Sequence, residues 1–221
     1  MNDDLRELLA KARGSATAAG ARIVRLDGLA GQGPERERWG LDALRGRLVE
    51  LSARGATATL TVATELVLDA QHAAEPVAWI TLSNTTFYPP DLAASGVDLS
   101  ALVVVRVLDA TAAARSAERL LRSGAFGLVV LDFGGTPTII VPTAHQGRLA
   151  TLAQTHDAAV VCITDKPGEA PSLGSLVSLR AEALRLHARD DDYDVTLRAL
   201  KDKRRGPGWS RTFRLHGPPG F

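Results

Sequence analysis

The sequence is poor in cysteine and has almost no net charge. Cys162 is the single cysteine among 221 residues, so no disulfide can form within the chain, which suits a reducing compartment. Lys and Arg number 26 and Asp and Glu number 25, which gives a formal net charge of +1. A globally basic protein is therefore excluded, and an anionic partner would have to meet a local patch. Because Cys162 stands in an apolar run, we expect it to be a buried small hydrophobe.

Long apolar runs and clustered histidines are lacking as well. No run approaches the roughly 20 apolar residues that a membrane span needs, and the acidic opening MNDD is unlike a signal peptide. We therefore expect a cytoplasmic protein with no membrane contact. The five histidines are scattered, with no two placed three or four residues apart, so no metal site is expected. They are His72, His145, His156, His187 and His216.

Apolar strands that alternate with amphipathic helices begin at Gly46. Uninterrupted apolar strands separated by helices are typical of a parallel sheet that is buried on both faces. We therefore predict an α/β fold with a mainly parallel central sheet flanked by helices. The strand-like runs are 47–52, 77–82, 101–107, 126–132 and 158–163, and the helix-like runs are 57–73, 110–123 and 145–157.

The alternation stops after Thr164. Residues 165–175, DKPGEAPSLGS, are rich in Pro and Gly and predict a mobile loop. Three runs of rough period two follow, at 176–187, 193–200 and 209–215. They predict an antiparallel meander that forms the C-terminal edge of the sheet.

The N-terminal residues read as a separate element. Leu5, Leu8 and Leu9 fall at helical spacing within DDLRELLAKAR, and a connector rich in Gly, Ala and Ser follows. These leucines either dock on the domain's own sheet or pack on a neighbouring protomer, so self-association stays open. The expected parts are a helix and connector at 1–20, the α/β domain at 21–216 and a tail at 217–221.

The stretch LSARGATATLT, residues 51–61, occupies the junction where a nucleotide-binding α/β protein has its phosphate loop. A working loop, GxxxxGK[ST], needs glycines that turn backbone N–H groups toward the phosphates, a Lys for their charge and a hydroxyl for Mg²⁺. Aligned on its trailing Thr-Leu-Thr, this chain has Ala56 for the second Gly, Thr57 for the Lys and Ala58 for the hydroxyl residue. We expect a degenerate phosphate loop, beginning at Gly55, that binds no nucleotide cofactor.

Arg54 and Asp132 are the remaining candidates for a nucleotide site. Arg54 stands where it could replace the missing Lys, but a solvated loop arginine is the simpler interpretation, given the lost glycines. Asp132 ends an apolar run, at the position of the acid on the Mg²⁺ side in P-loop proteins, although Asp also commonly ends a strand before a turn. A triad of Ser83, His145 and Asp132 has no nucleophile-elbow sequence behind it, and we treat it as coincidence. No catalytic residue is therefore expected.

A basic segment, KDKRRGPGWSRTFR at 201–214, stands out because the charges elsewhere nearly cancel. Basic residues interleaved with aromatics can follow a phosphodiester backbone while bases stack on the rings. A solvated hairpin tip is the alternative for the charges, and we favour a core position for Trp209 and Phe213. The candidate cations for binding a partner or DNA are Lys201, Lys203, Arg204, Arg205, Arg211 and Arg214.

Several phrases give the chain a family resemblance. Residues 46–61 and 96–132, the latter with GVD, a strand, a helix ending in RSG and a strand ending in Asp, resemble the RecA-like core. The stretches ITLSNTTFYPPDLAASGVDLSALVVVR and LKDKRRGPGW are similar to the ImuA family of bacterial accessory factors in mutagenic translesion synthesis. The resemblance implies a RecA-like fold without recombinase activity, a role in the SOS response, and association with an ImuB-type Y-family polymerase homologue and with RecA. We therefore expect a non-catalytic adaptor that links the two.

Two other functions remain open. A degenerate ATPase would use Arg54 and Asp132 and would bind Mg-ATP. A SulA-type inhibitor of cell division is also RecA-like, lacks the phosphate loop and would bind a tubulin-like GTPase. The YPP phrase at Tyr88 and the basic segment argue against this second alternative.

Overall fold

The structure is a computed structural model, and it describes residues 39–216 with the exception of six residues. These are residues 56, 84, 86, 137, 190 and 191. The predicted helix and connector at 1–20 with Leu5, Leu8 and Leu9, the tail at 217–221, and Ala56 lie outside the described residues.

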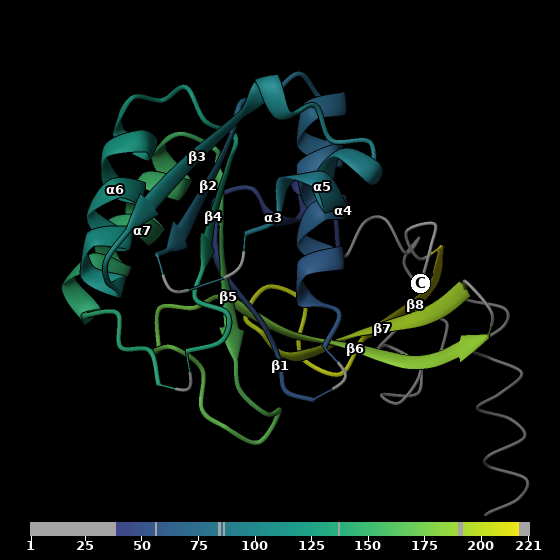
Figure 1. Cartoon of the computed structure of the whole chain (residues 1–221). Coiled ribbons are helices and arrows are strands. Elements are labelled where there is room, and N and C mark those ends of the chain that lie inside the picture. Colours follow the sequence, from purple (N-terminus) through teal and green to yellow (C-terminus); the bar gives the residue numbers. More distant parts are fainter. Residues whose placement is uncertain are drawn as a thin grey trace, which may run out of the picture. The chain divides into compact units, whose positions relative to one another are not determined.

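An eight-stranded sheet forms the centre of the described domain (Figure 1). Its strands are β1 (Arg47–Ala53), β2 (Val77–Leu82), β3 (Leu102–Val107), β4 (Leu128–Asp132), β5 (Ala159–Asp165), β6 (Leu179–Arg189), β7 (Asp192–Asp202) and β8 (Ser210–His216). Their spatial order is β3-β2-β4-β5-β1-β6-β7-β8. All neighbours from β3 to β6 pair in parallel, whereas β7 pairs antiparallel with both β6 and β8. The prediction of a mainly parallel sheet with an antiparallel C-terminal edge is thus confirmed.

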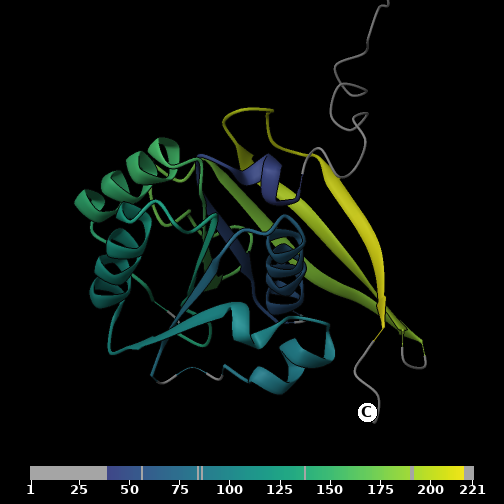
Figure 2. The same ribbon diagram turned by 90° about the horizontal axis from the view of Figure 1, so that it is seen from above.

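Helices cover both faces of the parallel strands (Figure 2). One face carries α3 (Leu41–Leu44), α4 (Thr59–His72) and α5 (Pro89–Ala94), and a 3-10 turn, η2 (Leu99–Ala101), leads into β3. The other face carries α6 (Ala110–Arg122) and α7 (Thr143–Thr155). The described domain therefore has three layers, with a separate hydrophobic core on each side of the sheet.

Strand alternation divides the apolar side chains between the two cores. In β1, Val49 and Leu51 pack on the α4 side, whereas Leu48 packs on the side of α6 and α7. Ala113 and Leu121 of α6 are fully or almost fully buried, on the helix face that its periodicity predicts. Cys162 is buried as expected, and burial raises the pKa of its thiol, which disfavours the reactive thiolate.

The strand β3 departs from the prediction that the parallel strands are buried on both faces. The residues Val103 and Val104 are 43% and 39% exposed. Among the described strands β3 pairs only with β2, so it forms the edge of the sheet. Its sequence is as apolar as that of a central strand, and for that reason the pattern alone gives no sign of an edge position.

The segment between β5 and β6, predicted as a mobile loop, is instead hydrogen-bonded to the core. Glu50 of β1 is fully buried and accepts a hydrogen bond from the N–H of Leu173, at 2.8 Å. The Nζ atom of Lys166 lies 2.6 Å from Oε1 of Glu50. Arg180 of β6 donates two further hydrogen bonds to carbonyls of the segment. The Pro and Gly content indicates the lack of regular structure correctly, but it does not reveal the buried charges that hold the segment.

Candidate functional site

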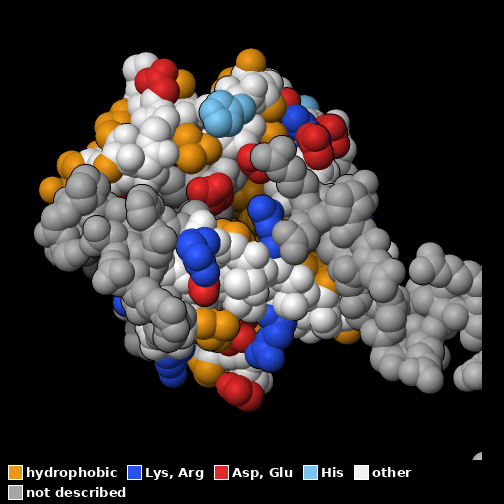
Figure 3. All heavy atoms as spheres, turned by 90° about the vertical axis from the view of Figure 1, so that its right-hand side faces the viewer, with side chains coloured by type: hydrophobic (Ala, Val, Ile, Leu, Met, Phe, Trp, Pro, Cys, Tyr) orange, Lys and Arg blue, Asp and Glu red, His pale blue; other side chains and the backbone are white. Residues whose placement is uncertain are grey.

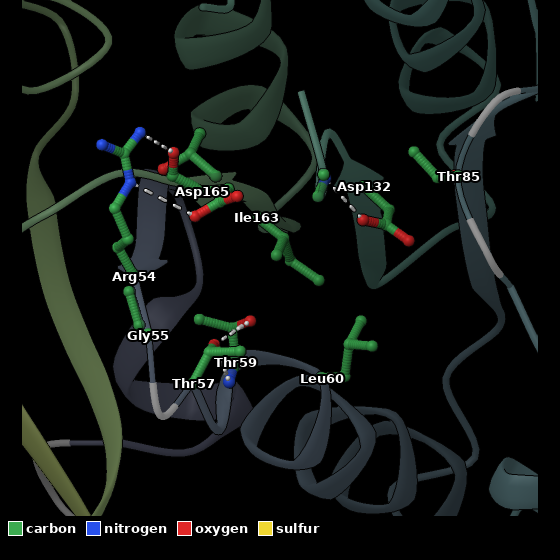
Figure 4. A pocket seen from close by; sticks show the side chains of 13 residues that line it. Arg54, Gly55, Thr57, Thr59, Leu60, Thr85, Asp132, Ile163 and Asp165 are labelled. Carbon is green, nitrogen blue, oxygen red and sulfur yellow. Dashed lines mark hydrogen bonds and ion pairs between the residues drawn. The ribbon is translucent and has the colours of Figure 1, made fainter. Parts of the chain in front are cut away.

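A cleft opens where the carboxyl ends of β1, β4 and β5 meet the N-terminus of α4 (Figure 4). Its volume is about 400 Å³. In open parallel sheets, ligands bind in crevices at this end of the strands. The lining residues are Ala53, Arg54, Gly55, Thr57, Thr59, Leu60, Thr85, Asp132, Gly134, Gly135, Ile163, Thr164 and Asp165.

Three backbone N–H groups of the described part of the loop from β1 to α4 are hydrogen-bonded within the protein. The N–H of Ala58 donates to the carbonyl of Ala183 in β6 at 3.0 Å, and Thr57 forms an antiparallel bridge with Leu184. The N–H of Thr57 donates to the carbonyl of Gly55 at 2.8 Å, and that of Thr59 donates to Oγ1 of Thr57 at 3.2 Å. A phosphate cradle requires such N–H groups to face the ligand, and these three are already occupied.

Gly55 is needed for the backbone conformation of the turn. Its φ of +85° lies in the left-handed region that favours glycine. A Cβ atom at this position would meet nothing within 4 Å. The single glycine kept in this loop therefore serves the backbone conformation.

Arg54 lies at the rim of the cleft and pairs with Asp165 (Figure 4). Its Nε atom is 3.8 Å from Oδ1 of Asp165, and its Nη2 donates to the carbonyl of Asp165 at 3.4 Å. The side chain is 53% exposed. This position agrees with the interpretation of Arg54 as a surface arginine and gives the cleft no central cation.

Asp132 is the buried acid of the cleft. The residue is 3% exposed, its Oδ2 accepts a hydrogen bond from Trp79 Nε1 at 3.3 Å, and its Oδ1 accepts one from the N–H of Gly134 at 3.0 Å. Burial raises the pKa of Asp132, although both hydrogen bonds act in the opposite direction. No described basic side chain pairs with it.

The formal charge of the lining is negative. Asp132 and Asp165 contribute −2 and Arg54 contributes +1, so the sum over the lining residues is −1. A triphosphate entering this cleft would meet like charge, with no lysine among the described lining residues to offset it.

The residues Ser83, His145 and Asp132 do not form a catalytic triad, because His145 and Asp132 have different partners. His145 belongs to α7, and its Nδ1 is 2.5 Å from Oε1 of Glu118 in α6. Asp132 instead contacts Trp79 and Gly134. Across the described part of the chain, no three His, Cys, Asp or Glu side chains gather as metal ligands would.

The basic segment is anchored by a buried carboxylate. Asp202 pairs with Arg47 of β1, with 2.6 Å between Oδ1 and Nη2, and it accepts a hydrogen bond from Trp209 Nε1 at 3.1 Å. Trp209 is 3% exposed, and Phe213 packs against the same core under the guanidinium of Arg211. The core position expected for Trp209 is confirmed, whereas Phe213 is only half-buried against that core.

The candidate cations of this segment all have partners inside the protein. Arg204 donates to the carbonyls of Arg45 and Gly46, at 3.2 Å each. On the face in Figure 3, basic and acidic side chains are interspersed among the described residues. Lys201 and Lys203 donate to carbonyls of the segment between β5 and β6. Arg211 donates to the carbonyl of Trp39, and Arg214 pairs with Asp194. The backbone N–H of Arg205 donates to Asp202.

Part of the cleft lining and the roles of two buried carboxylates, Glu50 and Asp202, were not predicted from the sequence. Asp165 and the hydroxyls of Thr59 and Thr85 line the cleft. Asp165 ends an apolar run, as Asp132 does, and that position was the available signal. Glu50 stands inside an apolar strand, and a charge there signals a buried partner.

No family model and no curated protein matches this chain. No helix among the described residues is long and apolar enough to cross a membrane.

Proposed function

We propose that this protein is a non-catalytic adaptor of the ImuA type, built on a RecA-like core, in SOS-induced mutagenic translesion synthesis. It would link an ImuB-type polymerase subunit to RecA through protein–protein contacts. The observation that carries the proposal is the loop from β1 to α4, where Ala58 is hydrogen-bonded to β6 instead of facing a ligand. A RecA-like protein that keeps this junction but cannot hold phosphates is left with recognition as its role.

The charge of the cleft supports the same conclusion. Triphosphate binding depends on Lys, Mg²⁺ and backbone N–H groups that neutralise several negative charges. Here Thr57 stands for the Lys, Asp132 has no described basic partner, and the lining sums to −1. An ATPase working through Arg54 and Asp132 is therefore disfavoured, since Arg54 lies exposed at the rim beside Asp165.

The basic segment remains the proposed partner surface, with a DNA contact as the alternative. Lys203, Arg204 and Arg205 are exposed at the turn after β7. Hydrogen bonds from Lys203 and Arg204 to carbonyls hold these side chains in place without neutralising their charge. Such pre-ordered cations would bind an acidic partner surface with a reduced entropic cost.

Co-purification with ImuB and RecA tests the proposal. A truncation before Lys201 is unsuitable because it would remove β8 and the buried Trp209. The sharper variant is Lys203→Glu combined with Arg205→Glu, and the matched control is Arg119→Glu with Arg122→Glu, an equal charge change on the exposed surface of α6.

We expect wild-type protein and the α6 control to recover both partners. Recovery of at least one partner should fall about tenfold for the variant at Lys203 and Arg205. Equal recovery for the two variants would remove the basic segment from the mechanism. Failure of the wild-type protein to recover either partner would remove the adaptor role.

A further inference from the structure

We propose that the cleft at the carboxyl ends of β1, β4 and β5 receives a basic side chain, arginine or lysine, from a partner protein, with Asp132 as its counter-ion. This goes beyond the adaptor role, because it assigns a ligand chemistry to the site that a nucleotide would occupy in a P-loop protein. It does not depend on which partner supplies the side chain.

The first support is a buried carboxylate that lacks a cation. Asp132 is 3% exposed and belongs to the cleft lining. Its oxygens receive one hydrogen bond each, from neutral donors on Trp79 and Gly134. A carboxylate oxygen can accept more than one hydrogen bond, and buried charges are normally paired. The nearest lining cation, Arg54, is engaged with Asp165 at the rim.

The second support is the change from an exposed aliphatic surface at the mouth of the cleft to a buried acid at its base. At the mouth, Leu60 is 48% exposed and presents an aliphatic surface. Toward the base, Ile163 is 1% exposed and Asp132 is 3% exposed. The side chains of Lys and Arg match this arrangement, because an aliphatic stem leads to a charged head group. Figure 4 shows Leu60, Ile163 and Asp132 around the same open space.

The third support is the supply of further acceptors. Oγ1 of Thr59 lies 3.0 Å from Oγ1 of Thr57, and Thr85 also lines the cleft. Hydroxyl oxygens accept hydrogen bonds from a guanidinium or an ammonium group. The volume of about 400 Å³ corresponds to roughly a dozen waters at about 30 Å³ each. A long side chain therefore has room to enter.

Anions and divalent metals fit the same site less well. The N-terminus of α4 favours anions, but the N–H groups of Thr59 and Ala58 are already bonded within the protein. The formal charge of the lining is −1. Divalent cations require several oxygen ligands around one point, and no group of three acidic or His side chains is positioned for this among the described residues.

The test uses N-acetyl-arginine amide as a probe for the full-length protein, with the neutral N-acetyl-citrulline amide as its isosteric control. Methyl resonances of Leu60 and Ile163 report on the mouth and the base. We expect the arginine probe to shift both, with a dissociation constant on the order of 1–10 mM, and the citrulline probe to leave them unchanged. Added salt should weaken the binding.

Two variants distinguish the contribution of the buried Asp132 to probe affinity from that of Asp165 at the rim. Asp132→Asn should reduce affinity for the arginine probe about tenfold, whereas Asp165→Asn should retain it. The unshifted resonance of the Trp209 indole, which is buried and donates to Asp202 instead, would confirm that Asp132→Asn is folded. The wild-type comparison of the two probes stands even if that variant fails to fold.

Several outcomes would overturn the proposal. They are equal shifts with both probes, no shift at tens of millimolar arginine probe, or shifts of the same methyls by pyrophosphate or Mg²⁺ alone. None of these outcomes decides whether ImuB and RecA co-purify with the protein, so the site and the adaptor role can fail separately.

Discussion

Arg47 and Asp202 form an ion pair across 155 residues of sequence, and both side chains are 1% exposed. The pair joins β1, in the centre of the sheet, to the start of the basic segment. Asp202 also accepts hydrogen bonds from the N–H groups of Arg204 and Arg205. The exposed cations of the proposed partner surface are thus positioned by a buried carboxylate.

Replacing Asp202 with Asn should strongly destabilise the fold. The buried guanidinium of Arg47 would lose its counter-ion, which typically costs about 3–5 kcal/mol of unfolding free energy. Urea denaturation at neutral pH measures the loss. Asp42→Asn is the control, because that side chain is 94% exposed and should change stability by less than about 1 kcal/mol. An equally small effect at Asp202 would show that the pair does not hold the segment.

The same carboxylate predicts a dependence of stability on pH. Burial alone would raise the pKa of Asp202, but hydrogen bonds from Arg47 and Trp209 outweigh it and hold the pKa below its ordinary value. A depressed pKa stabilises the folded state above the pKa of the unfolded chain, near 3.9, and this stabilisation is lost as pH falls through the folded-state pKa. Below about pH 4, wild-type protein should therefore lose stability more steeply than Asp202→Asn. Parallel slopes in urea titrations at several pH values would contradict this.

Glu50→Gln should loosen the segment between β5 and β6. Lys166 and Arg180 lie 2.6 Å and 3.9 Å from the carboxylate oxygens of Glu50, and both would remain near the core without its charge. We expect a loss of about 3–5 kcal/mol and faster hydrogen exchange at the amide of Leu173, measured by NMR. The exposed Glu169→Gln, in the same segment, is the control. Unchanged exchange at Leu173 would show that Glu50 does not hold the segment.

Thr57→Lys should not create a nucleotide site. The substitution restores the missing positive charge, but Ala58 stays hydrogen-bonded to Ala183, so the backbone cradle remains closed. The acids Asp132 and Asp165 would also remain. Calorimetry with Mg-ATP should show no binding to this variant. Binding in the micromolar range would mean that the lost lysine, and not the loop geometry, is what prevents nucleotide binding.

The sequence predicts which residues form the helices and strands of the described domain better than it predicts how the strands pair. Period and apolar content place β1, β2 and β5 within two residues of their observed ends, because local pattern reflects burial on both faces. The edge position of β3 depends on which strands pair, and the apolar sequence of β3 does not indicate that pairing. The helix α7 begins at Thr143, two residues before the predicted start, since helix ends depend on local capping.

The site was predictable in its chemistry but not in its contacts. The loss of lysine and glycines is read directly from Ala56, Thr57 and Ala58. The bridge between Thr57 and Leu184 of β6 joins residues that are far apart in the chain, so no local pattern reveals it. The same holds for Asp202, whose role depends on Arg47. Long-range pairings of this kind require the folded structure.

The most direct test of the account is calorimetric titration of the wild-type protein with Mg-ATP, because every proposal here requires that the cleft beside Asp132 does not hold a nucleotide. We expect no binding heat up to millimolar concentrations, corresponding to a binding free energy weaker than about −4 kcal/mol. A micromolar dissociation constant that is lost in Asp132→Asn would contradict it.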